Sequence, residues 1–234
     1  YVQSSQTSDG SQYSNTQATN QEFNADLMLN FDKSFNDFSV TANLGTATTY
    51  YTWNNLSGSA GLFNIPYLIA LANGRNQTVY EDYSKKRVNS VLGSATVGYK
   101  SMVYVDVTAR NDWSSTLPSS NWSYFYPSVS LSGIISEMVT LPEQISYLKV
   151  RGSWAKVGND TDPYKLYNVY ELGKTNGNIL NASTSSTFPL YNLQPEETNS
   201  TEVGVEFRMF KGRIGMDATY YKSNTINQIL RVTM

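Results

Sequence analysis

The chain has 234 residues and a formal net charge of −2, with 17 Lys and Arg against 19 Asp and Glu. It contains neither His nor Cys, which excludes Ser-His-Asp triads, thiol nucleophiles, disulfides and metal sites built from imidazole or thiolate. Its near-neutral balance argues against a nucleic-acid partner, which requires clustered Lys and Arg. The composition therefore predicts no enzyme of the familiar catalytic types and no cofactor.

Neither a helical membrane span nor a targeting segment is expected. The longest apolar stretch, residues 65–72, contains Pro66, and a membrane helix needs about 20 apolar residues. The chain opens at Tyr1 without the basic and apolar regions of a signal peptide.

Period-two alternation is the dominant pattern along the chain, and it predicts strands with one apolar face and one polar face. The polar face mixes Ser, Thr and Asn with charged residues such as Asp106, Arg151 and Glu206. The eight predicted strands cover residues 22–32, 38–46, 88–99, 103–110, 127–136, 146–157, 201–210 and 213–221.

The predicted connections alternate strictly in length. Short turns are expected at residues 33–37, 100–101, 137–144 and 211–212, and long loops at residues 47–87, 111–126 and 158–200. All long loops then fall at one end of the sheet. Transmembrane β-barrels combine this arrangement with strands of about 9–11 residues that have an apolar lipid face and a polar lumen face.

A soluble β-sandwich also alternates, so it remains the competing interpretation. In a sandwich the apolar face would lie against a second sheet in a dry core, whereas in a barrel it would face outward. Tyr and Trp residues near the predicted strand ends, such as Trp113, Tyr124 and Tyr126, could form the aromatic girdles of a barrel.

Two segments carry a resemblance to a known family. They read ARNDWSSTLPSSNWSYFYPSVSLS from Ala109 to Ser132 and LKVRGSWAKVGNDTDPY from Leu148 to Tyr164, and LQPEETNSTEVGVE follows from Leu193 to Glu206. In this order they resemble the SusC/RagA family of TonB-linked, or TonB-dependent, outer-membrane proteins of Bacteroidetes.

The resemblance implies that residues 1–234 are part of a single antiparallel transmembrane β-barrel domain of about 22 strands, with a plug domain and further strands outside this sequence. It also implies location in the bacterial outer membrane, contact with its lipid, and import of an oligosaccharide or peptide driven through TonB. The expected partner is a SusD-like surface lipoprotein that caps the barrel. The alternative is a surface or secreted β-sandwich that binds carbohydrate.

Candidate functional residues follow from these interpretations. Expected contacts with ligand or with the lipoprotein lid are Trp53, Arg110, Asp112, Trp113, Trp122 and Tyr124. Residues expected to form ion pairs on the lumen face are Lys149, Arg151, Glu202, Glu206, Arg208 and Asp217. Asp160 and Asp162 form a weak Ca²⁺ candidate, but they lack the spaced ligands of an EF-hand loop, so a turn held by their side chains is favoured.

Overall fold

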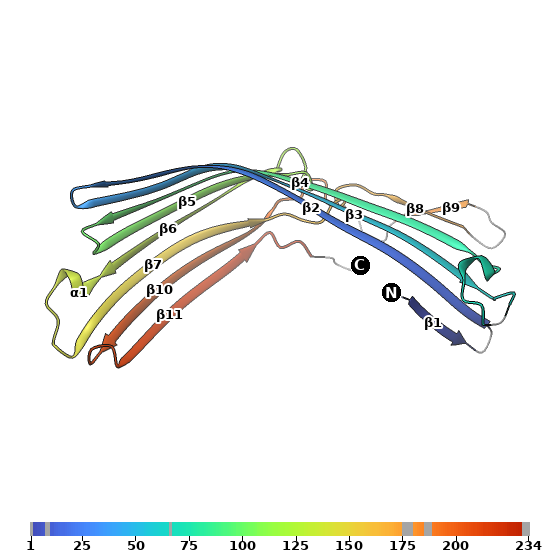
Figure 1. The fold of residues 1–234 in the computed structure, drawn as a ribbon. Coiled ribbons are helices and arrows are strands. Elements are labelled where there is room, and N and C mark those ends of the chain that lie inside the picture. The colour runs from blue at the N-terminus through green and yellow to red at the C-terminus, as the bar shows by residue number, and fades with distance from the viewer. Residues whose placement is uncertain (1, 8–9, 66, 175–179, 185–188, 231–234) are drawn as a thin grey trace. The chain divides into compact units, whose positions relative to one another are not determined.

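The chain forms an up-and-down antiparallel sheet. The computed structural model describes residues 2–7, 10–65, 67–174, 180–184 and 189–230. Nine strands make one sheet in the order β1-β2-β3-β4-β5-β6-β7-β10-β11, and β8 pairs with β9 separately (Figure 1). The strands are β1 Val2–Thr7, β2 Gly10–Phe35, β3 Phe38–Gly61, β4 Thr78–Tyr99, β5 Val103–Ser114, β6 Ser123–Ile134, β7 Ile145–Asn159, β8 Tyr170–Lys174, β9 Leu180–Thr184, β10 Glu196–Met209 and β11 Ile214–Ile226.

Two short helices interrupt the meander, the 3-10 helix η1 at Leu71–Asn73 and α1 at Ile135–Met138. Neither has the length and apolar character that crossing a membrane requires, and the described residues hold no other helix.

All eight predicted strands are confirmed as β2 to β7, β10 and β11. The predicted long loop at residues 47–87 is wrong, because β3 continues to Gly61 and β4 already begins at Thr78. These extensions carry polar residues on both faces, so they lack the apolar alternation that identifies a half-buried strand. The short strands β1, β8 and β9 were missed, and α1 replaces the predicted end of the strand at residues 135–136.

The structure divides into two compact units, which we describe separately. The first unit comprises residues 1–24 and 49–87, and the second comprises residues 25–48 and 88–234. The division falls where the apolar alternation of β2, β3 and β4 begins or ends.

Short turns join the strands at one end of the second unit. Lys100 and Ser101 both take positive φ between β4 and β5, at 49° and 57°, as a two-residue hairpin turn requires. The Lys100 amide donates to the Asp37 carbonyl at 2.7 Å, and the Lys100 ammonium lies 3.5 Å from the Asp37 carboxylate. A hydrogen bond with the Tyr99 side chain and the charge of Asp37 together raise the pKa of Lys100.

The loop at residues 62–77 closes the first unit and is ordered by one buried amide. The Asn73 side chain donates to the carbonyls of Ile65 and Leu68 at 2.7 and 2.8 Å and accepts from the Ile65 amide at 3.0 Å. Asn73 is only 6% exposed, so these bonds satisfy a polar group that would otherwise be costly to bury.

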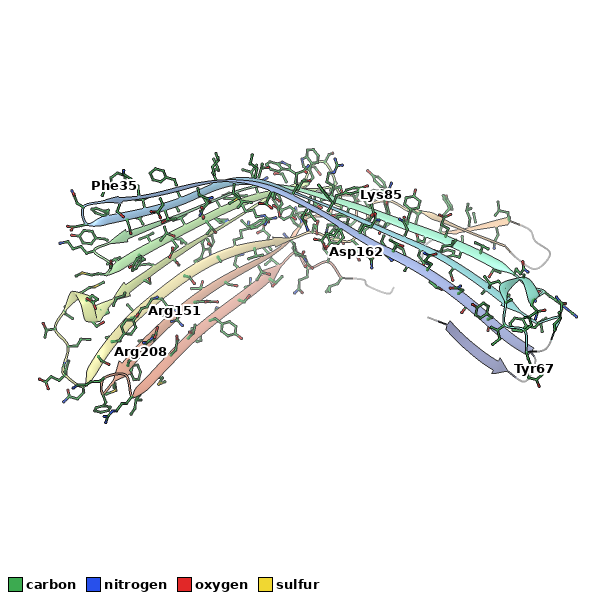
Figure 2. All side chains as sticks on the ribbon, in the orientation of Figure 1. Phe35, Tyr67, Lys85, Arg151, Asp162 and Arg208 are labelled. Carbon is green, nitrogen blue, oxygen red and sulfur yellow. The ribbon has the colours of Figure 1, made fainter. Side chains whose placement is uncertain are left out.

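The second unit has two chemically different faces. We call the face that carries Asp106, Arg151 and Asp217 the polar face and the opposite one the apolar face. Side chains of the apolar face are open to their surroundings, with Leu131 55% and Val203 59% exposed. Among the described residues the buried apolar side chains are only Ala60, Leu117 and Leu193, and Figure 2 shows side chains standing out from both faces of the strands. The dry core that a β-sandwich requires is therefore missing from the described part of the chain, which overturns that alternative.

Candidate functional site

The polar face is built by the register of neighbouring strands. Antiparallel pairing places Thr96, Asp106 and Ser130 side by side on β4, β5 and β6. The Asp106 carboxylate accepts from Thr96 Oγ1 at 2.7 Å and from Ser130 Oγ at 3.0 Å. One acidic side chain thus links three strands through hydroxyl groups.

A second carboxylate, Asp112, lies on the same face of β5 and is 4% exposed. It accepts from Arg110 Nε at 2.8 Å and from the Tyr126 hydroxyl. Arg110 Nη2 also donates to Ser90 Oγ at 2.9 Å, and its guanidinium lies 5.9 Å from the centre of the Tyr126 ring. Arg110 and Asp112, which were predicted as ligand or lid contacts, therefore form an internal cluster that joins β4, β5 and β6.

Next to this cluster, Tyr124 and Asp160 fix the ends of the neighbouring strands. The Tyr124 ring stacks on Tyr126 at 5.8 Å between centroids, and a Cβ at Gly158 of β7 would come within 2.5 Å of Tyr124. The absence of a side chain at Gly158 thus leaves room for the ring. Asp160 accepts from the hydroxyls of Ser114 and Thr116, the latter at 3.3 Å.

The placement of Tyr124 and Tyr126 on the polar face corrects their interpretation as girdle residues. Both lie in register with polar-face residues of β5, namely Asp112 and Arg110. The Tyr126 hydroxyl and ring contact Asp112 and Arg110, and the Tyr124 ring stacks on Tyr126, so both rings lie on the polar face. Trp113 does lie on the opposite face, between Asn89 and Ser123 of the adjacent strands, and is thus separated from the Arg110 cluster.

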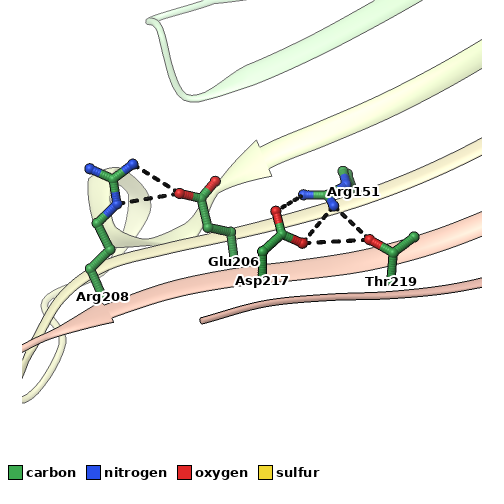
Figure 3. Close-up of polar contacts among 5 residues, drawn as sticks. All are labelled: Arg151, Glu206, Arg208, Asp217 and Thr219. Atoms are coloured by element: carbon green, nitrogen blue, oxygen red, sulfur yellow. Dashed lines mark hydrogen bonds and ion pairs between the residues drawn. The ribbon is translucent and has the colours of Figure 1, made fainter. Parts of the chain in front are cut away.

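A crossed ion pair forms further along the polar face. Arg151 of β7 lies opposite Gly204 of β10, which lies opposite Thr219 of β11. The Arg151 guanidinium passes over β10 and donates to both Asp217 oxygens, at 2.7 and 3.1 Å, and to Thr219 Oγ1 at 2.7 Å (Figure 3). A Cβ at position 204 would lie 2.6 Å from Arg151 Nε, so a side chain there would require Arg151 to shift from this path.

The structure brings together four of the six predicted ion-pair residues as partners. Arg151 pairs with Asp217, and Arg208 pairs with Glu206 at 2.9 Å (Figure 3). Glu206 lies directly opposite Asp217 on β11 and opposite Lys149 on β7. Lys149 and Glu202 occupy the same face, but no ion pair of theirs is found among the described residues.

The remaining predicted residues are more dispersed. Trp53 belongs to the first unit. Trp122 lies between β5 and β6 with an exposed side chain, and its backbone carbonyl accepts a hydrogen bond from the Ser114 amide at 2.9 Å. In the described part of the chain no group of three or more His, Cys, Asp or Glu residues could hold a metal ion. Asp160 instead accepts hydrogen bonds from the hydroxyls of Ser114 and Thr116, which supports the favoured interpretation of a turn held by side chains. Ca²⁺ binding by Asp160 and Asp162 stays a prediction.

Comparison with known proteins identifies one family across the chain. The family model described as TonB dependent receptor-like, beta-barrel matches residues 1–234. The chain is 31% identical over 187 residues to TonB-dependent receptor P26 of Formosa agariphila, covering 78% of this chain and 18% of that protein. It is 27% identical over 146 residues to TonB-dependent receptor P3 of the same organism, covering 58% of this chain and 14% of that protein. The chain thus spans less than a fifth of the length of these curated relatives.

Solved structures share the fold. The RagAB peptide transporter superposes with a TM-score of 0.79, and the RagAB peptide importer does so with 0.78 in its closed-closed state and 0.76 in its open-open state. Each match has 19% sequence identity and covers 92% of this chain and 24% of the other chain.

Proposed function

Because the chain belongs to the TonB-dependent receptor β-barrel family, we propose that the protein imports a polar nutrient, an oligosaccharide or a peptide, through the outer membrane. The chain forms part of the barrel wall in that membrane. Receptors of this family are transporters, and import through this protein would draw its energy through TonB.

The main observation in support of the proposal is that one face of this single-layer sheet is apolar and the other is polar. The apolar face suits lipid chains, and the polar face offers hydroxyls, carboxylates and guanidinium groups to an aqueous lumen. Charges on such a face are costly in a membrane unless they are paired, and the ion pairs of Arg151 and Arg208 meet that requirement.

We further propose that a SusD-like surface lipoprotein caps the mouth of this barrel. The support is the length of two connections in the sequence, residues 62–77 between β3 and β4 and residues 160–195 between β7 and β10. Trp53 and Trp122 are the aromatic candidates for ligand or lid contact, while Arg110, Asp112 and Tyr124 would act there by holding strand ends in place.

Growth and co-purification of the whole protein test these proposals. A strain lacking the gene should lose growth on particular oligosaccharides or peptides as sole nutrient and regain it with the wild-type gene. A copy that cannot engage TonB should fail to restore growth. Affinity purification of the tagged protein should recover a surface lipoprotein in stoichiometric amount, and recovery of the barrel alone would contradict the proposed partnership.

A further inference from the structure

The connection between β7 and β10 carries the same short motif twice. It reads Leu-Tyr-Asn followed by an aliphatic residue, at residues 166–169 and again at residues 190–193. The rings of its two tyrosines, Tyr167 and Tyr191, lie 6.2 Å apart between centroids and are tilted by 55°. The two residues are 68% and 63% exposed, so the contact between the rings leaves most of each ring open. Apolar surface that is exposed and grouped in this way marks a binding site more often than scattered single residues do.

The second copy of the motif is fixed against the loop between β5 and β6. Asn121 Nδ2 of that loop donates to Asn192 Oδ1 at 2.9 Å and to the Leu193 carbonyl at 3.1 Å. Leu193 is itself buried. Tyr191 therefore precedes two anchored residues, and Tyr167 lies against it. A surface that is held in place before its ligand arrives loses less entropy on binding.

The polar groups beside the rings are uncharged, and some of them are unused. Asn192 Oδ1 accepts from Asn121, whereas Asn192 Nδ2 has no hydrogen-bond partner among the residues that the structure describes. Asn168 follows Tyr167 in the first copy of the motif, and its side chain is exposed. An amide group both donates and accepts hydrogen bonds, so it matches a hydroxyl group, which does the same.

Open ring faces beside neutral amides suit a sugar better than a peptide. Ligand sites combine aromatic surface with a few polar groups that orient the ligand. Tyrosine offers a large and rigid ring at low cost in conformational entropy, and the negative face of that ring attracts the C–H groups on one side of a sugar. The charged ends of a peptide would find no opposite charge on Tyr167, Tyr191, Asn168 or Asn192.

We infer that Tyr167 and Tyr191 form a platform on which an uncharged oligosaccharide binds. The rings stack on the sugar units, and Asn192 Nδ2 donates to a sugar hydroxyl. This inference rests on the proposed import function and deepens it, because it assigns one class of solute to a named surface of the chain. We call the two residues the tyrosine platform.

Two other roles for the ring pair make different predictions. If the rings only pack the connection between β7 and β10 onto itself, removing them should speed proteolysis there and leave the affinity for sugars unchanged. If they contact the surface lipoprotein instead, removing them should reduce its co-purification with the protein and again leave sugar binding unchanged. Either pattern would overturn the inference.

Binding of oligosaccharides to the purified full-length protein in detergent tests the platform. The probes are an array of neutral hexasaccharides, hexasaccharides that contain uronic acids, and a library of uncharged hexapeptides. Calorimetry with the neutral hexasaccharide that the wild type binds best then gives the affinities of the variants. We expect Y167A and Y191A each to bind it about 3- to 10-fold more weakly, and Y167A/Y191A about 10- to 50-fold more weakly.

Two further variants serve as controls. Y167F/Y191F keeps both ring faces, so its affinity should stay within about 3-fold of wild type. Tyr220→Ala removes a similarly exposed ring from the apolar face of β11, where Tyr220 lies opposite Val203. Because that face is separate from the platform, its affinity should stay within about 2-fold of wild type.

Several results would overturn the inference. These are unchanged affinity of Y167A/Y191A, an equal loss in Y220A, a loss in Y167F/Y191F as large as that in Y167A/Y191A, or a wild-type preference for the hexapeptides or for no oligosaccharide at all. If the double variant does not fold, unchanged affinity in both single variants would equally refute the platform.

Growth separates the failure of the platform from the failure of the proposed import. Full rescue of a deletion strain by Y167A/Y191A, with the oligosaccharide at limiting concentration, would refute the platform and leave import standing. A deletion strain with no growth defect on any nutrient would count against import, whereas binding in detergent does not depend on transport.

Discussion

Replacing Asp112 by Asn should destabilise the protein more than the same replacement at Asp106. Both carboxylates lie on the polar face of β5, and each accepts two hydrogen bonds. An Asn side chain has one oxygen and one NH₂ group, so it can accept from only one of the two former partners. The outcome therefore depends on whether a partner interacts with the negative charge as well as with the oxygen atoms.

At Asp106 both partners are hydroxyls, which can rotate and accept from the new amide. The cost of D106N should therefore stay below about 1 kcal/mol. At Asp112 the guanidinium of Arg110 cannot accept, so the Asn oxygen must face it, while the Tyr126 hydroxyl can accept from the new amide. D112N therefore loses the negative charge beside Arg110, at a side chain that is almost fully buried. Hydrogen bonds to charged groups contribute about 1.5–3 kcal/mol, and the Arg110 side chain is 43% exposed, which weakens the ion pair. We expect a loss of about 2 kcal/mol for D112N.

Urea unfolding of the whole protein in detergent micelles, followed by tryptophan fluorescence, would measure both variants. A double-mutant cycle of D112N with Tyr126→Phe should give less than the sum of the single losses, because both changes affect the hydrogen bond between these two side chains. Equal midpoints for D106N and D112N, or a larger loss for D106N, would refute the reasoning from partner chemistry.

Three further substitutions test other parts of the structure. Gly204→Ala should displace Arg151 from Asp217. Arg151→Gln should therefore lower the unfolding midpoint in the wild type but not in the Gly204→Ala background. Equal losses in both backgrounds would show that the ion pair of Arg151 does not depend on the glycine. Asn73→Ala should cost about 2–3 kcal/mol within the loop at residues 62–77 and speed its cleavage in limited proteolysis, whereas the exposed Asn76→Ala should leave cleavage unchanged. Val150→Arg, on the apolar face, should reduce the free energy of folding into lipid vesicles by about 2–4 kcal/mol if position 150 lies near the bilayer midplane. Ser153→Arg, on the polar face, is the control. An equal loss in both variants would contradict the assignment of the faces.

The strands that the sequence identifies are those with unequal faces. Alternation located the second unit because lipid and lumen impose opposite polarity on successive residues. It failed for the far half of β3, residues 49–61, because polar residues occur there on both faces, as Thr52 and Asn54 on one and Asn55 and Ser57 on the other. No period distinguishes such a strand from a polar loop, and its length emerges only from pairing with its neighbours.

The candidate site was predictable to the extent that it depends on one strand. Arg110 and Asp112 were predicted together as ligand or lid contacts where a strand enters a loop, and the structure joins them directly because β5 continues to Ser114. The partner of Asp217 was beyond reach, since Arg151 contacts it across an intervening strand. That contact depends on the registers of two strand pairs. It also depends on Gly204, which has no side chain and so leaves space for Arg151. Tyr126 was assigned to a girdle because an aromatic ring near a strand end suits either face, and only its pairing with Arg110 decides between them.

The crossed ion pair also restricts the order in which substitutions can accumulate at three positions. In a single-layer sheet a side chain ordinarily depends on adjacent strands alone, so changes two strands apart should be independent. Gly204 limits that independence, because a side chain there would require Arg151 to shift from its position beside Asp217, which lies directly opposite Glu206. We therefore expect replacement of the glycine to be tolerated better once Asp217 has lost its charge, so that substitutions at positions 151, 204 and 217 depend on one another.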